Sequence, residues 1–92
     1  MSSLIKMRVT KSDGTSSDYV VTPLVIVSFE REHKTSFQAA MSDGNIRMEH
    51  LSWLGWKAEM VAKKAAGDIT RLFDDRYLEE LVAAEVVVDE NP

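Results

Sequence analysis

The chain of 92 residues is 45% hydrophobic and 28% charged and contains no cysteine, which predicts one small globular domain without disulfides or thiolate metal sites. No apolar run approaches the roughly 18 residues that span a bilayer, and the first residues lack the pattern of a secretory signal. The formal net charge of −4 is uneven, because seven acids and one base give residues 73–92 a charge of −6 and leave +2 on residues 1–72. This acidic end argues against nucleic-acid binding. It is compatible with docking on a basic partner, and equally with a surface that is simply exposed to water.

The first 21 residues predict a β-hairpin. Ile5, Met7 and Val9 alternate with polar residues, which is the period of a half-buried strand. Asp13-Gly14 supplies a turn signal, and residues 18–21 predict the returning strand.

The next segment, 23–33, predicts a helix. Thr22 offers an N-cap hydroxyl, and Pro23 suits the first helical position. The β-branched run after Pro23 favours a strand by propensity. We nevertheless predict a helix, because a helix would place the apolar residues of this segment on one face and would allow Glu30 to pair with Lys34.

A short helical turn over 35–41 and a break at 42–45 precede a long helix, which we expect over about residues 46–66. Gly67 fits the position just after a helix end. The apolar residues of the long helix repeat at intervals of three and four and predict one buried stripe, made of Leu51, Leu54, Ala58, Val61 and Ala65.

The last part of the chain predicts a short helix capped by Asp74, with Tyr77, Leu78 and Leu81 facing inward. The β-branched segment 84–88 is a candidate third strand beside the hairpin, because a two-stranded ribbon alone is only marginally stable. The predicted fold class is therefore α+β. An N-terminal hairpin, or a three-stranded antiparallel sheet if Val86–Val88 joins it, packs against a helical region with one long central helix. Residues 1–88 form the single domain, and 89–92 form a frayed acidic tail.

The residue spacing predicts no catalytic, cofactor or metal site. His50 directly follows Glu49, and adjacent helical positions point about 100° apart. The other histidine, His33, lies on a different element, and the spacing of a zinc protease is absent. No glycine-rich phosphate loop or nucleophile elbow occurs.

The two tryptophans, Trp53 and Trp56, lie three residues apart on one side of the long helix. Packing in the core is the simpler interpretation, because large aromatics dominate the cores of small domains. A ring that stays exposed would instead anchor a partner. Only Lys57 lies close, which disfavours a platform for stacking nucleic-acid bases.

Several motifs follow one another in a recognisable order. Thr22-Pro23, an apolar run and Phe29-Glu30 are followed by Glu49-His50-Leu51, Trp53 and Trp56-Lys57-Ala58, then by Phe73-Asp74 and an acidic, valine-rich end. This order resembles the tail assembly chaperones of long-tailed bacteriophages, especially those infecting actinobacteria. The resemblance covers nearly the whole chain. One departure is Leu72, where many relatives have a proline before the Phe-Asp pair.

The resemblance implies a non-enzymatic protein of the host cytoplasm. Such chaperones bind the long, aggregation-prone tape measure protein before the tail tube polymerises around it. They often occur in two forms, and a programmed ribosomal frameshift makes the longer one, whose extension engages the tail tube subunit. This chain is similar to the shorter form. Homo-oligomers are expected, because many copies would be needed to cover an extended client, whereas nucleic acid and membrane are not expected partners.

A client helix would bind through apolar positions in a groove, for which the sequence suggests Phe29, Trp53, Trp56 and Met60. Two alternative functions stay open. One is a structural virion or head–tail joining protein, and the other is a small nucleic-acid-binding regulator.

Overall fold

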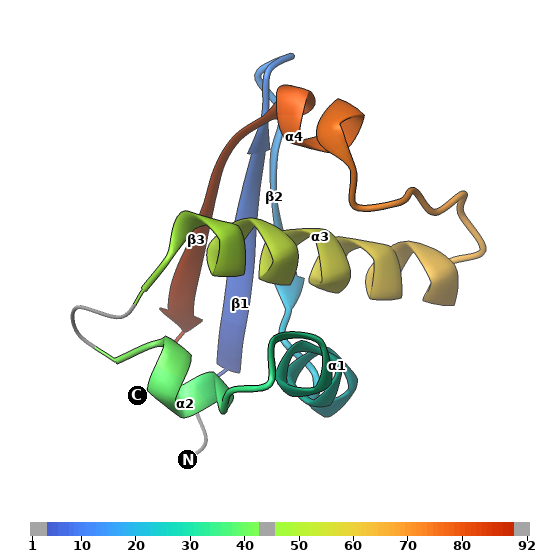
Figure 1. The fold of residues 1–92 in the computed structure, drawn as a ribbon. Helices are drawn as coiled ribbons and strands as arrows, with labels where there is room; N and C mark the ends of the chain where they lie inside the picture. The colour runs from blue at the N-terminus through green and yellow to red at the C-terminus, as the bar shows by residue number, and fades with distance from the viewer. Residues whose placement is uncertain (1–3, 43–45, 90–92) are drawn as a thin grey trace.

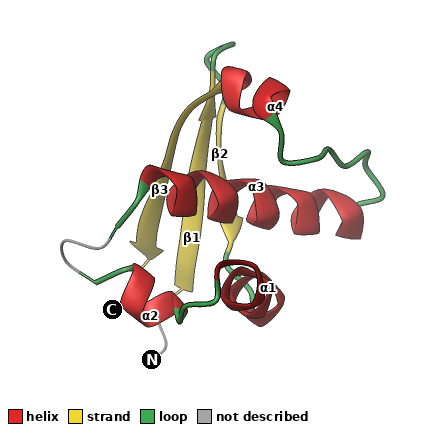
Figure 2. Cartoon of the chain, in the orientation of Figure 1, coloured by secondary structure: helices red, strands yellow, loops and turns green. Residues whose placement is uncertain are grey.

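In a computed structural model, residues 4–42 and 46–89 are described, and they form an α+β fold with three strands and four helices (Figures 1 and 2). Strands β1 (Leu4–Lys11), β2 (Ser16–Val20) and β3 (Leu81–Asp89) make one antiparallel sheet in the order β2-β1-β3. The central strand is therefore β1. The predicted hairpin and the candidate third strand are both confirmed.

Pairing with β3 joins the two ends of the described chain, because Leu4 lies opposite Asp89 in the sheet. The hairpin turn depends on Gly14, whose φ of 91° favours glycine. The Asp13 carboxylate also accepts hydrogen bonds from the Thr15 N–H and hydroxyl, at 2.9 and 2.7 Å. Asp89, predicted as the first residue of the frayed acidic tail, is instead the last residue of β3, and residues 90–92 of that tail lie outside the described residues.

Helix α1 (Pro23–His33) begins as predicted, with the Thr22 hydroxyl accepting the Val25 N–H at 3.4 Å. The predicted pairing of Glu30 with Lys34 is wrong. Lys34 has left the helix with a φ of 53°, and the Glu30 carboxylate instead accepts the N–H of Phe37 at 2.9 Å. That bond ties α1 to α2 (Phe37–Ala40), the short helical turn expected in this region.

Helix α3 (Met48–Ala65) is the predicted long helix and ends in a Schellman motif. The N–H groups of Gly67 and Asp68 donate to the carbonyls of Lys64 and Lys63, at 3.1 and 2.8 Å. Gly67 has the positive φ, 79°, that this motif requires.

Helix α4 (Asp75–Glu80) is capped as expected by Asp74, whose carboxylate accepts the Tyr77 N–H at 3.0 Å. Tyr77 is buried, but Leu78 is 39% exposed, so the prediction that it faces inward is wrong. The helix is only six residues long, and it turns a single large side chain to the core. Leu81 is half-buried and begins β3.

One face of the sheet is covered by α3, which contacts all three strands, and α1 packs against α3 (Figure 1). The close approach depends on Gly55, since a Cβ there would lie 3.2 Å from both the Ala84 Cβ and the Val9 Cγ2.

The predicted stripe is right only in part. Leu54 and Ala58 are buried, Leu51 and Val61 are half-buried, and Ala65 is exposed. The end of α3 extends beyond the sheet and so leaves Ala65 uncovered (Figure 1).

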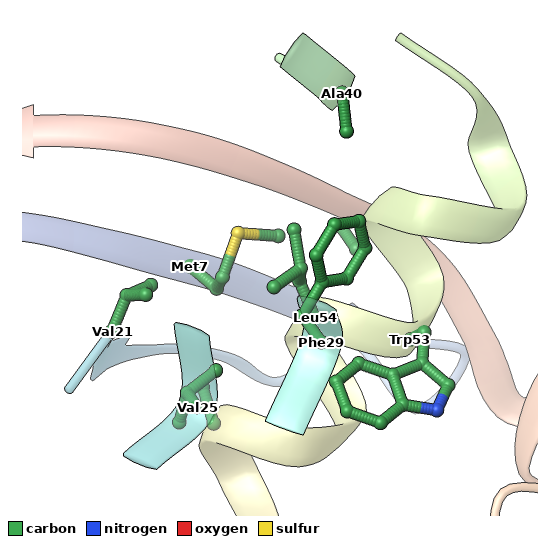
Figure 3. Packing of buried hydrophobic residues seen from close by; sticks show 9 residues of the cluster. Met7, Val21, Val25, Phe29, Ala40, Trp53 and Leu54 are labelled. Carbon is green, nitrogen blue, oxygen red and sulfur yellow. The ribbon is translucent and has the colours of Figure 1, made fainter. Parts of the chain in front are cut away.

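The hydrophobic core lies between the sheet, α1 and α3 (Figure 3). Phe29 from α1 meets Trp53 from α3 edge to face, with ring centroids 6.0 Å apart. The buried cluster contains Met7, Val21, Val25, Phe29, Ala40, Trp53, Leu54, Ala58 and Ala84.

Candidate functional site

A groove runs along α3. Two adjoining depressions of about 670 and 390 Å³ share Trp56 and Lys57, and we call them together the α3 groove. The larger depression, toward the N-terminal part of α3, is bounded by α1 and Phe73. The smaller one, toward the C-terminal part, is bounded by Leu24 of α1 and by residues 70–72. The groove therefore lies where two helices and the segment after α3 meet.

The segment after α3 forms one wall of the groove and is held in place by three contacts of Arg71. Its carbonyl accepts the Trp56 Nε1–H at 2.8 Å, and its N–H donates to the Met60 sulfur at 3.0 Å. Its guanidinium donates to the Glu80 carboxylate at 2.7 Å, which raises the arginine pKa and lowers the glutamate pKa. Trp56 and Met60 thus both line the groove and fix its wall.

The structure brings three of the four sequence-suggested residues to the α3 groove. Trp53 lines the larger depression, Met60 the smaller, and Trp56 both. Trp53 and Met60 are nevertheless buried, at 8% and 5% exposure, so that only Trp56 of the three is half-exposed. Phe29 has 0% exposure and packs within the core, so a client cannot reach it in this conformation. Its ring packs edge to face against the Trp53 ring, which lines the groove.

An aromatic series runs through the larger depression. The rings of Trp53 and Trp56 lie 5.6 Å apart, and Phe73 continues the series 5.5 Å from Trp56. Trp56 and Phe73 are only half-buried, so part of each ring remains accessible. Half-exposed aromatics supply contact area at low entropic cost, which is typical of protein-binding surfaces.

The two histidines lie close together and line a small depression with Ala39 and Ala40 of α2. Their ring centroids are 4.9 Å apart, and His33 stacks on Phe29 at 4.5 Å. His50 Nδ1 is buried and has no hydrogen-bond partner among residues 4–42 and 46–89. Burial, together with the nearby His33 and Arg47, lowers the pKa of His50. Within residues 4–42 and 46–89, no group of three potential metal ligands gathers here or elsewhere.

A buried polar network, which sequence reasoning missed, connects α3, α4 and β1. Glu59 is 3% exposed, and its two oxygens accept the Tyr77 hydroxyl at 2.7 Å and the Lys11 ammonium at 3.3 Å. Burial, and then the hydrogen bond to Glu59, raise the pKa of Tyr77 strongly. Lys11 also lies over the Tyr77 ring, 4.9 Å from its centroid. We call this the Glu59 network; its residues line neither half of the α3 groove, which indicates a structural role.

The smaller half of the α3 groove combines aromatic and aliphatic side chains with cationic ones, as in grooves that accept an amphipathic helix. The larger half is lined mostly by polar and charged side chains, including Glu32 and Glu49, beside its three aromatic rings. None of the described helices is both long and apolar enough to cross a membrane. Comparison with protein-family models, with curated proteins and with solved structures finds no match to this chain.

Proposed function

We propose that this chain is a phage tail assembly chaperone that binds the tape measure protein without catalysing a reaction. The proposal rests on the sequence resemblance described above, and the observation that carries it is the α3 groove. A tape measure protein is long and helical, and a helix with one apolar face is the kind of client such a groove accommodates. The groove offers half-exposed Trp56 and Phe73 together with the apolar residues of its smaller depression.

The resemblance extends the proposal to partners and place of action. The protein would act in the host cytoplasm as a homo-oligomer arrayed along one client chain. A longer frameshifted form would add contacts to the tail tube protein. Neither nucleic acid nor membrane is part of this proposal.

Co-expression with the tape measure protein tests the proposal directly. The client should be recovered in the soluble fraction only when this chain is present. Leu72→Asp places a charge on a groove residue that is 78% exposed, so it should abolish solubilisation while the protein stays folded. Met48→Asp is the matched control, because Met48 is 70% exposed and lines neither half of the α3 groove.

Two outcomes would contradict the proposal. The first is a client that stays insoluble with the wild-type chain. The second is an abundance of peptides from this chain in purified virions, measured by mass spectrometry, which would indicate a structural virion protein instead.

A further inference from the structure

We propose that the smaller depression of the α3 groove selects a client helix whose apolar face is bordered by Asp or Glu side chains. This inference rests on the client-binding function proposed above and adds the chemistry of the client. It concerns the half of the groove that lies beside the C-terminal part of α3.

The floor of the smaller depression is apolar. It is formed by Leu24 from α1, by Trp56, Met60 and Val61 from α3, and by Leu72 from the segment that follows. Leu24 and Leu72 are exposed, so they project where a partner would cover them. An uncovered apolar surface on three neighbouring segments is typical of a protein-binding site.

The rim of the same depression is cationic. Lys57, Lys64 and Arg71 line it together with Thr70, and no carboxylate is among the lining residues. The larger depression differs, because Glu32 and Glu49 lie there beside its cations. The positive rim is therefore specific to the smaller half, in a chain whose formal net charge is −4.

The lysines carry the available charge. Arg71 already donates to Glu80 at 2.7 Å, whereas Lys57 and Lys64 make no ion pair with any described residue. Lys57 lies over the Trp56 ring, 5.6 Å from its centroid, so its charge is held at the groove. A helix that buries leucines on this floor would bring its flanking side chains to these ammonium groups. Acidic flanks would be attracted and basic flanks repelled.

Two synthetic peptides test this inference. Both have the 18-residue length of α3 and the same leucine repeat, and they carry either Glu or Lys at the flanking positions. Binding to the full chain is measured by fluorescence anisotropy at low and high salt. The Glu peptide should bind about tenfold more tightly than the Lys peptide at low salt, and the difference should shrink as salt screens the charges.

Lys64→Glu should weaken binding of the Glu peptide about fivefold, because an exposed charge at a binding rim contributes modestly. Lys63→Glu is the matched control, since it makes the same charge change one residue away and Lys63 lines neither half of the groove. Equal affinity for the two peptides, or equal effects of the two substitutions, would overturn the inference. So would self-association of the chain that Lys64→Glu abolishes, because a second copy would then occupy the groove.

The inference and the proposed function can fail separately. If the tape measure protein becomes soluble but the Glu and Lys peptides bind with equal affinity, the proposed function stands and the charge selectivity is wrong. If the Glu peptide binds selectively but the tape measure protein stays insoluble, the selectivity stands and the proposed function is wrong.

Discussion

Replacing Tyr77 with phenylalanine removes one hydroxyl from the Glu59 network and changes little else in shape. That hydroxyl donates to a carboxylate that is 3% exposed, at 2.7 Å. A hydrogen bond to a charged group contributes about 1.5–3 kcal/mol, and its loss leaves a buried charge less well solvated. Lys11 still reaches the other oxygen at 3.3 Å, so the carboxylate keeps one partner. We therefore expect the free energy of unfolding to fall by about 2 kcal/mol, within this range.

Urea denaturation followed by tryptophan fluorescence measures this loss. A thermal scan should show the melting temperature falling by roughly 10 °C, since 1 kcal/mol corresponds to about 4–8 °C in a domain of this size. Tyr19→Phe is the control: Tyr19 is half-buried in β2, and its hydroxyl makes no hydrogen bond with a described residue. If Tyr77→Phe destabilises the protein no more than Tyr19→Phe, the Glu59 network does not stabilise the fold as we argue.

Three further predictions concern close packing, helix termination and pH. Gly55→Ala should lower the free energy of unfolding by about 1 kcal/mol in urea titrations, because overpacking costs about 1–3 kcal/mol and outweighs the helix propensity that alanine gains. The new Cβ would lie 3.2 Å from the Ala84 Cβ, which is attached directly to the β3 backbone and cannot rotate away. An unchanged or increased stability of Gly55→Ala would show that α3 can move off the sheet. Gly67→Ala should also lower the free energy of unfolding by about 1 kcal/mol, but for a different reason. A Cβ at this position meets nothing within 4 Å, so the cost comes only from the strain of an alanine at a φ of 79°. A neutral result in the same urea titration would contradict this explanation. The lowered pKa of His50 means that the unfolded chain binds a proton more readily, so stability should decline as pH falls below about 6.5 toward the folded-state pKa. His50→Gln should flatten that part of the pH profile measured by urea unfolding, and an unaltered slope would assign the decline to other groups.

Local signals in the sequence were sufficient for most of the elements. Helix boundaries could be predicted without knowing the fold where a residue caps its own neighbouring backbone. Such residues are Thr22 with Pro23 at the start of α1, Gly67 at the end of α3, and Asp74 at the start of α4. The hairpin followed from alternation and an Asp-Gly turn in the same way. The third strand was suggested by β-branched residues, but its pairing with β1 needed the tertiary structure.

The candidate site could be predicted only in part. Trp53, Trp56 and Met60 were selected as large apolar residues of the long helix, and the structure places all three at the α3 groove. Trp53 and Met60 are also buried, and Phe29, which has the same chemistry, is covered completely because it packs on Trp53 at the contact between α1 and α3. Periodicity cannot separate these cases, since it identifies a face and not what covers that face.

The sequence by itself was sufficient to predict the α+β class and the helix boundaries at Thr22, Gly67 and Asp74, and it is the sole basis of the resemblance from which the function is proposed. The tertiary structure alone decided which apolar residues are covered and which charges are buried. Glu59 looks like an exposed helical residue in sequence, but it is buried because Tyr77 and Lys11 reach it from 18 and 48 residues away. The wall of the α3 groove likewise depends on Arg71 bonding to Trp56, 15 residues earlier. Such contacts depend on long-range packing, and no local pattern encodes them.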